Sequence, residues 1–115
     1  MRISIKATGF DLTPALTDYV HNKLGPLSRF VKRLEEETEF EMRCEIGKTT
    51  RHHHKGNIFR AEANLLLPGK MVRAAQSDED IRIAITNLKD TLRLEIRRYK
   101  DKLIKRRRPP SSRER

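Results

Sequence analysis

A run of apolar residues spaced three and four apart constrains the fold of this chain more than any other feature. At about 100° per residue, the run forms one narrow stripe, which is typical of an amphipathic helix packed against another layer. Its members are Ile81, Ile85, Leu88, Leu92, Ile96, Tyr99 and Leu103. Ser77 with Asp80 three residues later resembles a capping box, and it predicts that the helix begins there. Pro109 and Pro110 predict that it ends after Arg108.

Shorter patterns predict the strands. Apolar and polar residues alternate over residues 3–7, 40–46 and 59–67, as in strands with one face exposed to solvent. Pro68-Gly69 predicts a tight turn, after which residues 70–76 return as the second arm of a hairpin. Between the second and third strands, the composition of residues 47–56 predicts a basic loop.

A first helix is predicted to begin with Thr13 as N-cap and Pro14 at the first helical position. Apolar residues keep helical register as far as Leu34, through Gly25 and Pro26. The register favours one bent helix, and a break is the alternative because Pro26 removes a backbone hydrogen bond.

The predicted order is therefore β-α-β-β-β-α. Segregated strands with two matching apolar stripes predict an α+β fold, a two-layer sandwich in which two helices pack on one face of a four-stranded sheet. Residues 1–104 form one predicted domain. Residues 105–115 form a basic tail whose Pro, Ser, Arg and Glu composition predicts disorder.

Charge indicates the class of partner. The 115 residues include 26 Lys and Arg against 16 Asp and Glu, a net charge of +10, which favours binding to polyanions, nucleic acid before anionic membrane. The candidate RNA-binding residues on the predicted helices are Lys23, Arg29, Lys32, Arg33, Arg82, Lys89, Arg93, Arg97 and Lys100. If the two helices lie side by side, these cations form one surface, and a merely solvated basic face is the alternative.

Catalytic and metal-binding interpretations are weaker. The single Cys44 fits a reducing cytoplasm, and its place on an apolar strand face predicts a core residue rather than a nucleophile. His52, His53 and His54 lack a second ligand pair at zinc spacing, so they predict a basic loop tip. The sequence contains no Gly-rich phosphate loop, no nucleophile elbow and no membrane-spanning apolar run. We therefore predict a cytoplasmic protein that is not an enzyme and has no metal or cofactor.

Several local patterns, taken in order, resemble a known family over residues 1–104. They are Leu12-Thr13-Pro14-Ala15-Leu16, Tyr19-Val20 through Lys23-Leu24, Phe59-Arg60-Ala61-Glu62 to Leu67, Ala74 to Asp80, and Lys100-Asp101-Lys102-Leu103. The chain resembles the short hibernation-promoting factors and ribosome-associated inhibitors, also called ribosomal subunit interface proteins. The match depends on many small similarities and on no single sharp motif.

The resemblance implies a stress-response factor that docks in the decoding region of the 30S subunit, alone or within the 70S ribosome, and blocks the tRNA and mRNA paths. Its partner would be mainly 16S rRNA, and the protein would be a monomer off the ribosome. The positions carried over by match are Lys23, Arg98, Lys100 and Lys102. The family usually has an aromatic residue at the position where this chain has Arg82.

Two other functions are compatible with the sequence. A double-stranded-RNA-binding domain also packs two helices on a sheet, but it usually lacks a leading strand such as residues 3–7. An older name for the family, sigma-54 modulation proteins, points to a protein-interaction regulator of transcription.

Overall fold

The computed structural model describes residues 1–32, 39–50 and 56–107. Its elements, in chain order, are β1 (Arg2–Thr8), α1 (Pro14–Leu24), the 3₁₀ turn η1 (Gly25–Leu27), α2 (Ser28–Val31), β2 (Glu41–Thr50), β3 (Asn57–Leu67), β4 (Lys70–Asp78) and α3 (Ile81–Arg107). Arg33, the three adjacent histidines and residues 108–115 lie outside the described residues. Lys105 to Arg107, the first residues of the predicted tail, are helical.

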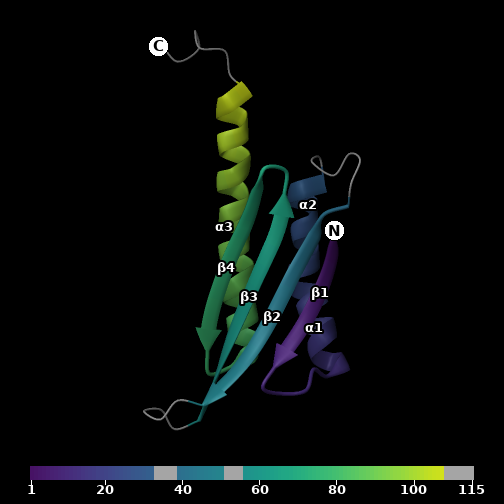
Figure 1. The fold of residues 1–115 in the computed structure, drawn as a ribbon, viewed down its shortest axis with the longest axis vertical. Helices are drawn as coiled ribbons and strands as arrows, with labels where there is room; N and C mark the ends of the chain where they lie inside the picture. Colours follow the sequence, from purple (N-terminus) through teal and green to yellow (C-terminus); the bar gives the residue numbers. More distant parts are fainter. Residues whose placement is uncertain (33–38, 51–55, 108–115) are drawn as a thin grey trace.

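The four strands form one sheet in the order β1-β2-β3-β4. β1 pairs with β2 in parallel, and the β2–β3 and β3–β4 pairs are antiparallel. Both helical segments cover the same face of the sheet, and the C-terminal turns of α3 extend past the β3–β4 turn (Figure 1). The predicted two-layer β-α-β-β-β-α sandwich is therefore confirmed.

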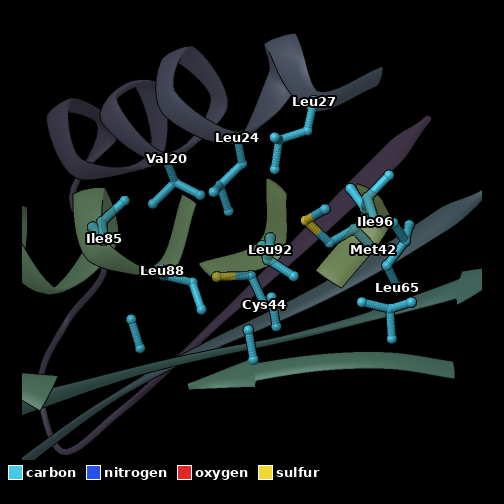
Figure 2. Packing of buried hydrophobic residues seen from close by; sticks show 14 of the residues in the cluster. Val20, Leu24, Leu27, Met42, Cys44, Leu65, Ile85, Leu88, Leu92 and Ile96 are labelled. Atoms are coloured by element: carbon cyan, nitrogen blue, oxygen red, sulfur yellow. The ribbon is translucent and has the colours of Figure 1, made fainter. Parts of the chain in front are cut away.

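The apolar stripe of α3 packs as the spacing predicted. Ile85, Leu88 and Leu92 are fully buried, whereas Ile81 and Leu103 at its two ends are partly buried. Side chains of the first helical segment and of the sheet meet this stripe, and Figure 2 shows several of them. The sheet-facing side of each helix is thus used for the core, which leaves the flanks for other contacts.

The first helical segment begins as predicted, with the Leu16 backbone N–H donating to the Thr13 hydroxyl at 3.1 Å. At Gly25 and Pro26 the path neither stops nor continues as a regular α-helix. A 3₁₀ turn joins α1 to α2, and the backbone stays right-handed helical at Leu24, Gly25, Leu27 and Ser28. This tighter turn accommodates Pro26, which has no backbone N–H to donate, without ending the helical path. The bent-helix interpretation is therefore closer to the structure than a break.

The start of α3 differs from the sequence prediction. Ser77 lies in β4, opposite Arg60 of β3, and the strand continues to Asp78. Asp80 instead acts at the helix start, where its carboxylate accepts a hydrogen bond from the Arg82 N–H at 2.8 Å. Pairing with β3 therefore outweighs the local capping pattern at Ser77.

The β2–β3 hairpin is longer than predicted, because β2 continues to Thr50 and the predicted basic loop is shorter. β1 ends opposite Gly47, so the last residues of β2 pair only with β3. Gly9, just after β1, has φ of 84° and lies under the Lys48 carbonyl, where an added Cβ would approach within 2.6 Å. A side chain there would clash with backbone, which explains the glycine.

Candidate nucleic-acid interface

A groove runs between the first helical segment and α3, which α1 and α2 both contact. Two adjoining hollows of about 400 and 420 Å³ make up this interhelical groove, and they share Phe30 and Arg93. The first is lined by Lys23, Pro26, Leu27, Arg29, Phe30, Lys89 and Arg93. The second is lined by Phe30, Arg93, Ile96, Arg97, Lys100, Asp101 and Ile104.

The groove concentrates positive charge from both helical segments. Six cations line it, namely Lys23, Arg29, Lys89, Arg93, Arg97 and Lys100, together with one acid, Asp101. Within residues 1–32, 39–50 and 56–107, none of the six forms an ion pair with a carboxylate. The side-by-side placement on which the predicted surface depended is therefore present.

Tyr19 of α1 holds two predicted RNA-binding cations at one end of the helix pair. The Lys23 ammonium lies 5.6 Å from its ring centroid, and the Arg82 guanidinium carbon lies 5.4 Å from it. The Tyr19 hydroxyl lies 3.1 Å from the Thr86 hydroxyl on α3. Cation–π contacts of this kind stabilise a cation's position without neutralising its charge.

Phe30 has a similar role in the middle of the groove. It is partly buried against the core, and the Arg93 guanidinium carbon lies 5.1 Å from its ring centroid. Neither aromatic residue was predicted from the sequence to be part of the site. Phe30 lies just off the apolar stripe of the first segment and next to Arg29. This position indicates a role in the site only once the placement of the two helices is known.

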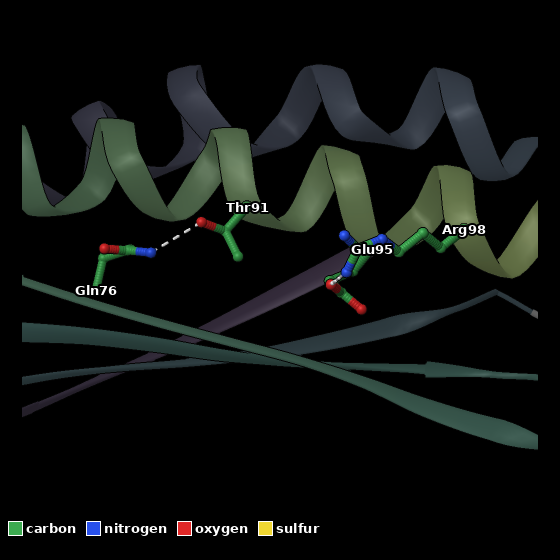
Figure 3. A network of polar contacts seen from close by, with 4 residues as sticks. All are labelled: Gln76, Thr91, Glu95 and Arg98. Atoms are coloured by element: carbon green, nitrogen blue, oxygen red, sulfur yellow. Dashed lines mark hydrogen bonds and ion pairs between the residues drawn. The ribbon is translucent and has the colours of Figure 1, made fainter.

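The predicted residues Arg98 and Lys102 lie apart from the groove. Neither lines its hollows, and the Arg98 guanidinium forms an ion pair with Glu95 at 2.9 Å. In Figure 3, this pair lies on the near side of α3, on the same side as the hydrogen bond from Gln76 of β4 to Thr91, while the first helical segment passes behind α3. Lys32, at the end of α2, is exposed but also outside the groove lining.

Residues with a possible catalytic or stacking role occupy structural positions. Cys44 is 3% exposed, and burial raises the pKa of its thiol to about 12, so a reactive thiolate is disfavoured. The Tyr99 hydroxyl donates to the Pro68 carbonyl at 2.7 Å from a buried ring. Phe10 packs edge-on against Phe59, with ring centroids 5.8 Å apart.

The described residues contain neither a cluster of metal ligands nor a membrane-spanning helix. No group of three or more His, Cys, Asp or Glu side chains within 1–32, 39–50 and 56–107 is placed to hold a metal ion. The histidines that raised the question, at positions 52–54, are not among these residues. In the same ranges, no helix is long and apolar enough to cross a membrane.

Comparison with known proteins gives the family. The model of the sigma 54 modulation protein / S30EA ribosomal protein family matches residues 3–104. The chain belongs to this family. Its match covers the sheet except Arg2, the first helical segment and all but the last turn of α3.

Several named members of the family are similar in sequence. A ribosome hibernation promoting factor from Azotobacter vinelandii is 30% identical over 106 residues, which cover 92% of this chain and 89% of the relative. One from Klebsiella oxytoca is 28% identical, covering 90% and 97%. A ribosome hibernation promotion factor from Deinococcus radiodurans is 27% identical, but the match covers only 48% of its length.

Solved structures share the fold. The N-terminal domain of Thermus thermophilus Protein Y superposes with a TM-score of 0.63 at 27% identity, over 86% of this chain and 99% of that domain. A ribosomal subunit interface protein from Coxiella burnetii superposes with a TM-score of 0.66 over 88% of this chain and 99% of its own. At 21% identity, this second likeness shows the fold alone.

Proposed function

We propose that this protein is a ribosome hibernation factor that binds the decoding region of the small ribosomal subunit through its interhelical groove and blocks the paths of tRNA and mRNA. The observation that carries the proposal is the meeting of six cations from two helical segments in one groove, with no ion pair to a described carboxylate. Family membership and the names of the relatives point to the ribosome as the polyanion.

The proposed mechanism is steric and electrostatic. Lys and Arg side chains displace counterions from rRNA phosphates, which supplies affinity that decreases as salt increases. The body of the sheet then occupies space that tRNA and mRNA need. Such a factor transfers no group, so it requires neither a catalytic residue nor a cofactor, in line with the burial of Cys44.

The proposed partners are the 30S subunit and the 70S ribosome, contacted mainly through 16S rRNA in the cytoplasm by a monomer. Folded rRNA is recognised largely by shape and by its phosphates. A double-stranded-RNA-binding module is disfavoured by β1, which pairs along its full length with β2 and so extends the sheet by a leading strand.

Sedimentation with purified ribosomes tests the proposal. We expect the protein to move with 30S and 70S particles at low salt, to dissociate as salt is raised, and to compete with tRNA bound in the P site. Chemical footprinting of 16S rRNA should show protection in the decoding region. Absence from both particles, or binding to free duplex RNA with equal affinity, would contradict the proposal.

A further inference from the structure

The floor of the interhelical groove is apolar, although its rims are cationic. Pro26, Leu27 and Phe30 line it from the first helical segment, and Ile96 lines it from α3. Leu27 and Ile96 are almost fully buried, so they form a fixed base, whereas Phe30 is only partly buried. A site for phosphates alone has no need of an apolar floor or of an accessible aromatic ring.

The cations on α3 are spaced as a ladder along one side of this floor. Lys89, Arg93 and Arg97 follow one another at intervals of four residues, and Lys100 follows three residues later. Residues at these intervals lie on neighbouring turns with Cβ atoms about 5–6 Å apart. One strand of nucleic acid lying along α3 would present a phosphate to each of them in turn.

Phe30 and Arg93 lie together where the two hollows meet. The guanidinium carbon of Arg93 lies 5.1 Å from the centroid of the Phe30 ring, and the Arg93 side chain is exposed. Both groups offer flat surfaces on which unpaired bases stack. A base that enters the groove can displace the exposed Arg93 guanidinium from the ring and lie between the two.

We infer that the interhelical groove binds a short unpaired segment of RNA, with its phosphates on the α3 cations and one base stacked at Phe30. The inference rests on the proposed RNA-binding role of this groove, and it names the kind of RNA. Each hollow, near 400 Å³, is in the lower part of the size range of small-ligand sites, which suits single nucleotides.

Duplex RNA fits these observations less well. An A-form helix keeps its bases stacked inside and presents sugars and phosphates to a protein surface. Against Phe30 and Ile96, those polar groups would lose water without gaining hydrogen bonds. Asp101, the one acid in the lining, would also repel a second phosphate strand where the groove runs toward the C-terminus of α3. A single strand with its bases turned toward the floor avoids both costs.

Fluorescence anisotropy with short probes tests the inference on the full chain. The probes are a labelled hexa-adenylate RNA, an abasic hexamer with the same phosphates, and a blunt RNA duplex of equal length. We expect hexa-adenylate to bind most tightly. Its log–log salt dependence should have a slope of about −2 to −3, because three or four phosphate contacts contribute about −0.7 each.

Phe30→Leu keeps an apolar side chain on the core but removes the ring. We expect it to weaken hexa-adenylate binding at least about fivefold, the low end of what one stacked base contributes, and to leave the abasic probe unchanged. Phe10→Leu is the matched control, because Phe10 is also partly buried but lies outside the groove lining. Far-UV circular dichroism checks that both variants fold.

Arg93→Lys provides a second test that does not touch the core. It keeps the charge but removes the planar guanidinium, so hexa-adenylate binding should weaken while abasic binding stays within twofold. Equal losses on both probes, or duplex binding as tight as hexa-adenylate binding, would overturn the inference. Sedimentation with 70S ribosomes separates the two levels: ribosome binding without base-dependent binding refutes only this inference, whereas no ribosome binding refutes the proposed function.

Discussion

The helical side of the molecule and the open face of the sheet both carry many cations, but in opposite arrangements. On the open face, cations and acids are intermixed, although two acids, Glu45 and Glu62, also lie opposite each other. The cations are Arg2, Lys6, Arg43, Arg60 and Arg73, and the acids are Glu41, Glu45 and Glu62. Arg2 lies opposite Glu41 and Lys6 opposite Glu45, and Arg43 and Arg60 form 3.3 Å ion pairs with nearby glutamates.

In the groove, by contrast, like charges repeat along one helix and face more of the same sign across it. Lys89, Arg93 and Arg97 stand at i, i+4 intervals, where like charges destabilise a helix by about 0.2–0.5 kcal/mol per pair. A fold would not gain stability from this arrangement, whereas a polyanion-binding surface does gain affinity from it. The pairing of charges, rather than their number, therefore distinguishes the groove, the proposed interface, from the open face of the sheet.

Removing the same number of positive charges from each face is the strongest test of the difference between them. Replacing Lys89, Arg93 and Arg97 together by Ala should weaken ribosome binding on the order of 100-fold at moderate salt, because three phosphate contacts are lost. The magnitude of the log–log salt slope should decrease by about 2 to 3. Equilibrium binding to labelled 30S subunits over a salt series measures both quantities.

The matched control for this triple replaces Arg43, Arg60 and Arg73 of the open face by Ala. It removes the same charge, so nonspecific attraction falls equally, but affinity should stay within about threefold because none of the three side chains lines the groove. If the control lost as much affinity as the groove triple, net charge alone would account for binding and the contrast between the faces would have no functional meaning.

The covered face of the sheet should make the stability of the protein depend on pH, through Cys44 of β2. Its thiol is buried on the covered face, and this burial raises its pKa from 9.0 to about 12. Unfolding exposes the thiol, so above pH 9 the unfolded state loses a proton that the folded state retains. Stability contributed by this group is complete below pH 9 and should fall by about 1 kcal/mol between pH 9 and 10.

Urea unfolding of the protein and of Cys44→Ala at several pH values measures that slope. The variant leaves a small cavity and is less stable at every pH. Other titrating groups contribute equally to both slopes of stability against pH, so the difference between the two slopes reports Cys44 alone. Parallel slopes would show that the Cys44 thiol ionises as readily in the folded protein as in the unfolded chain.

Periodicity in the sequence was sufficient to predict the layers. The stripe from Ile81 to Leu103 and the alternation in β2 depend on which side of an element is apolar, and burial of Leu88 and Met42 follows from that directly. The start of α3 was predicted wrongly because Ser77 satisfies a local capping pattern but pairs with Arg60 in the sheet. A long-range contact decides that position, and local pattern cannot reveal it.

The groove could be predicted only in part, for a similar reason. The cationic flank from Arg82 to Lys100 was visible in the sequence, but its partner across the groove depends on how the two helical segments sit on the sheet. That placement brings Lys23 and Arg29 opposite Lys89 and Arg93. It also makes Phe30 part of the lining. The position of Phe30 in the sequence, next to the apolar stripe, does not predict this role.

Two double variants test whether the proposed RNA contacts lie on the groove flank of α3 or on the flank that carries Arg98. Arg98 and Lys102 lie outside the groove lining, and Arg98 is already paired with Glu95. Replacing both by Ala should reduce 30S affinity less than threefold, whereas Arg97→Ala with Lys100→Ala should reduce it about tenfold. Equal losses in the same binding assay would mean that RNA reaches both flanks of α3, and that the groove is only part of the interface.

The smallest expected effect has opposite signs on the two faces. Lys89→Gln removes a like-charge i, i+4 pair with Arg93, so it should stabilise the protein by about 0.3 kcal/mol at low ionic strength. Lys6→Gln removes an opposite-charge pair across strands with Glu45, so it should destabilise by a similar amount. Thermal unfolding at low and high salt measures both, and salt should shrink each difference because it screens exposed charges. If both substitutions shifted stability in the same direction, relief of the overall charge of +10 would explain them, and the local pairing that distinguishes the two faces would not.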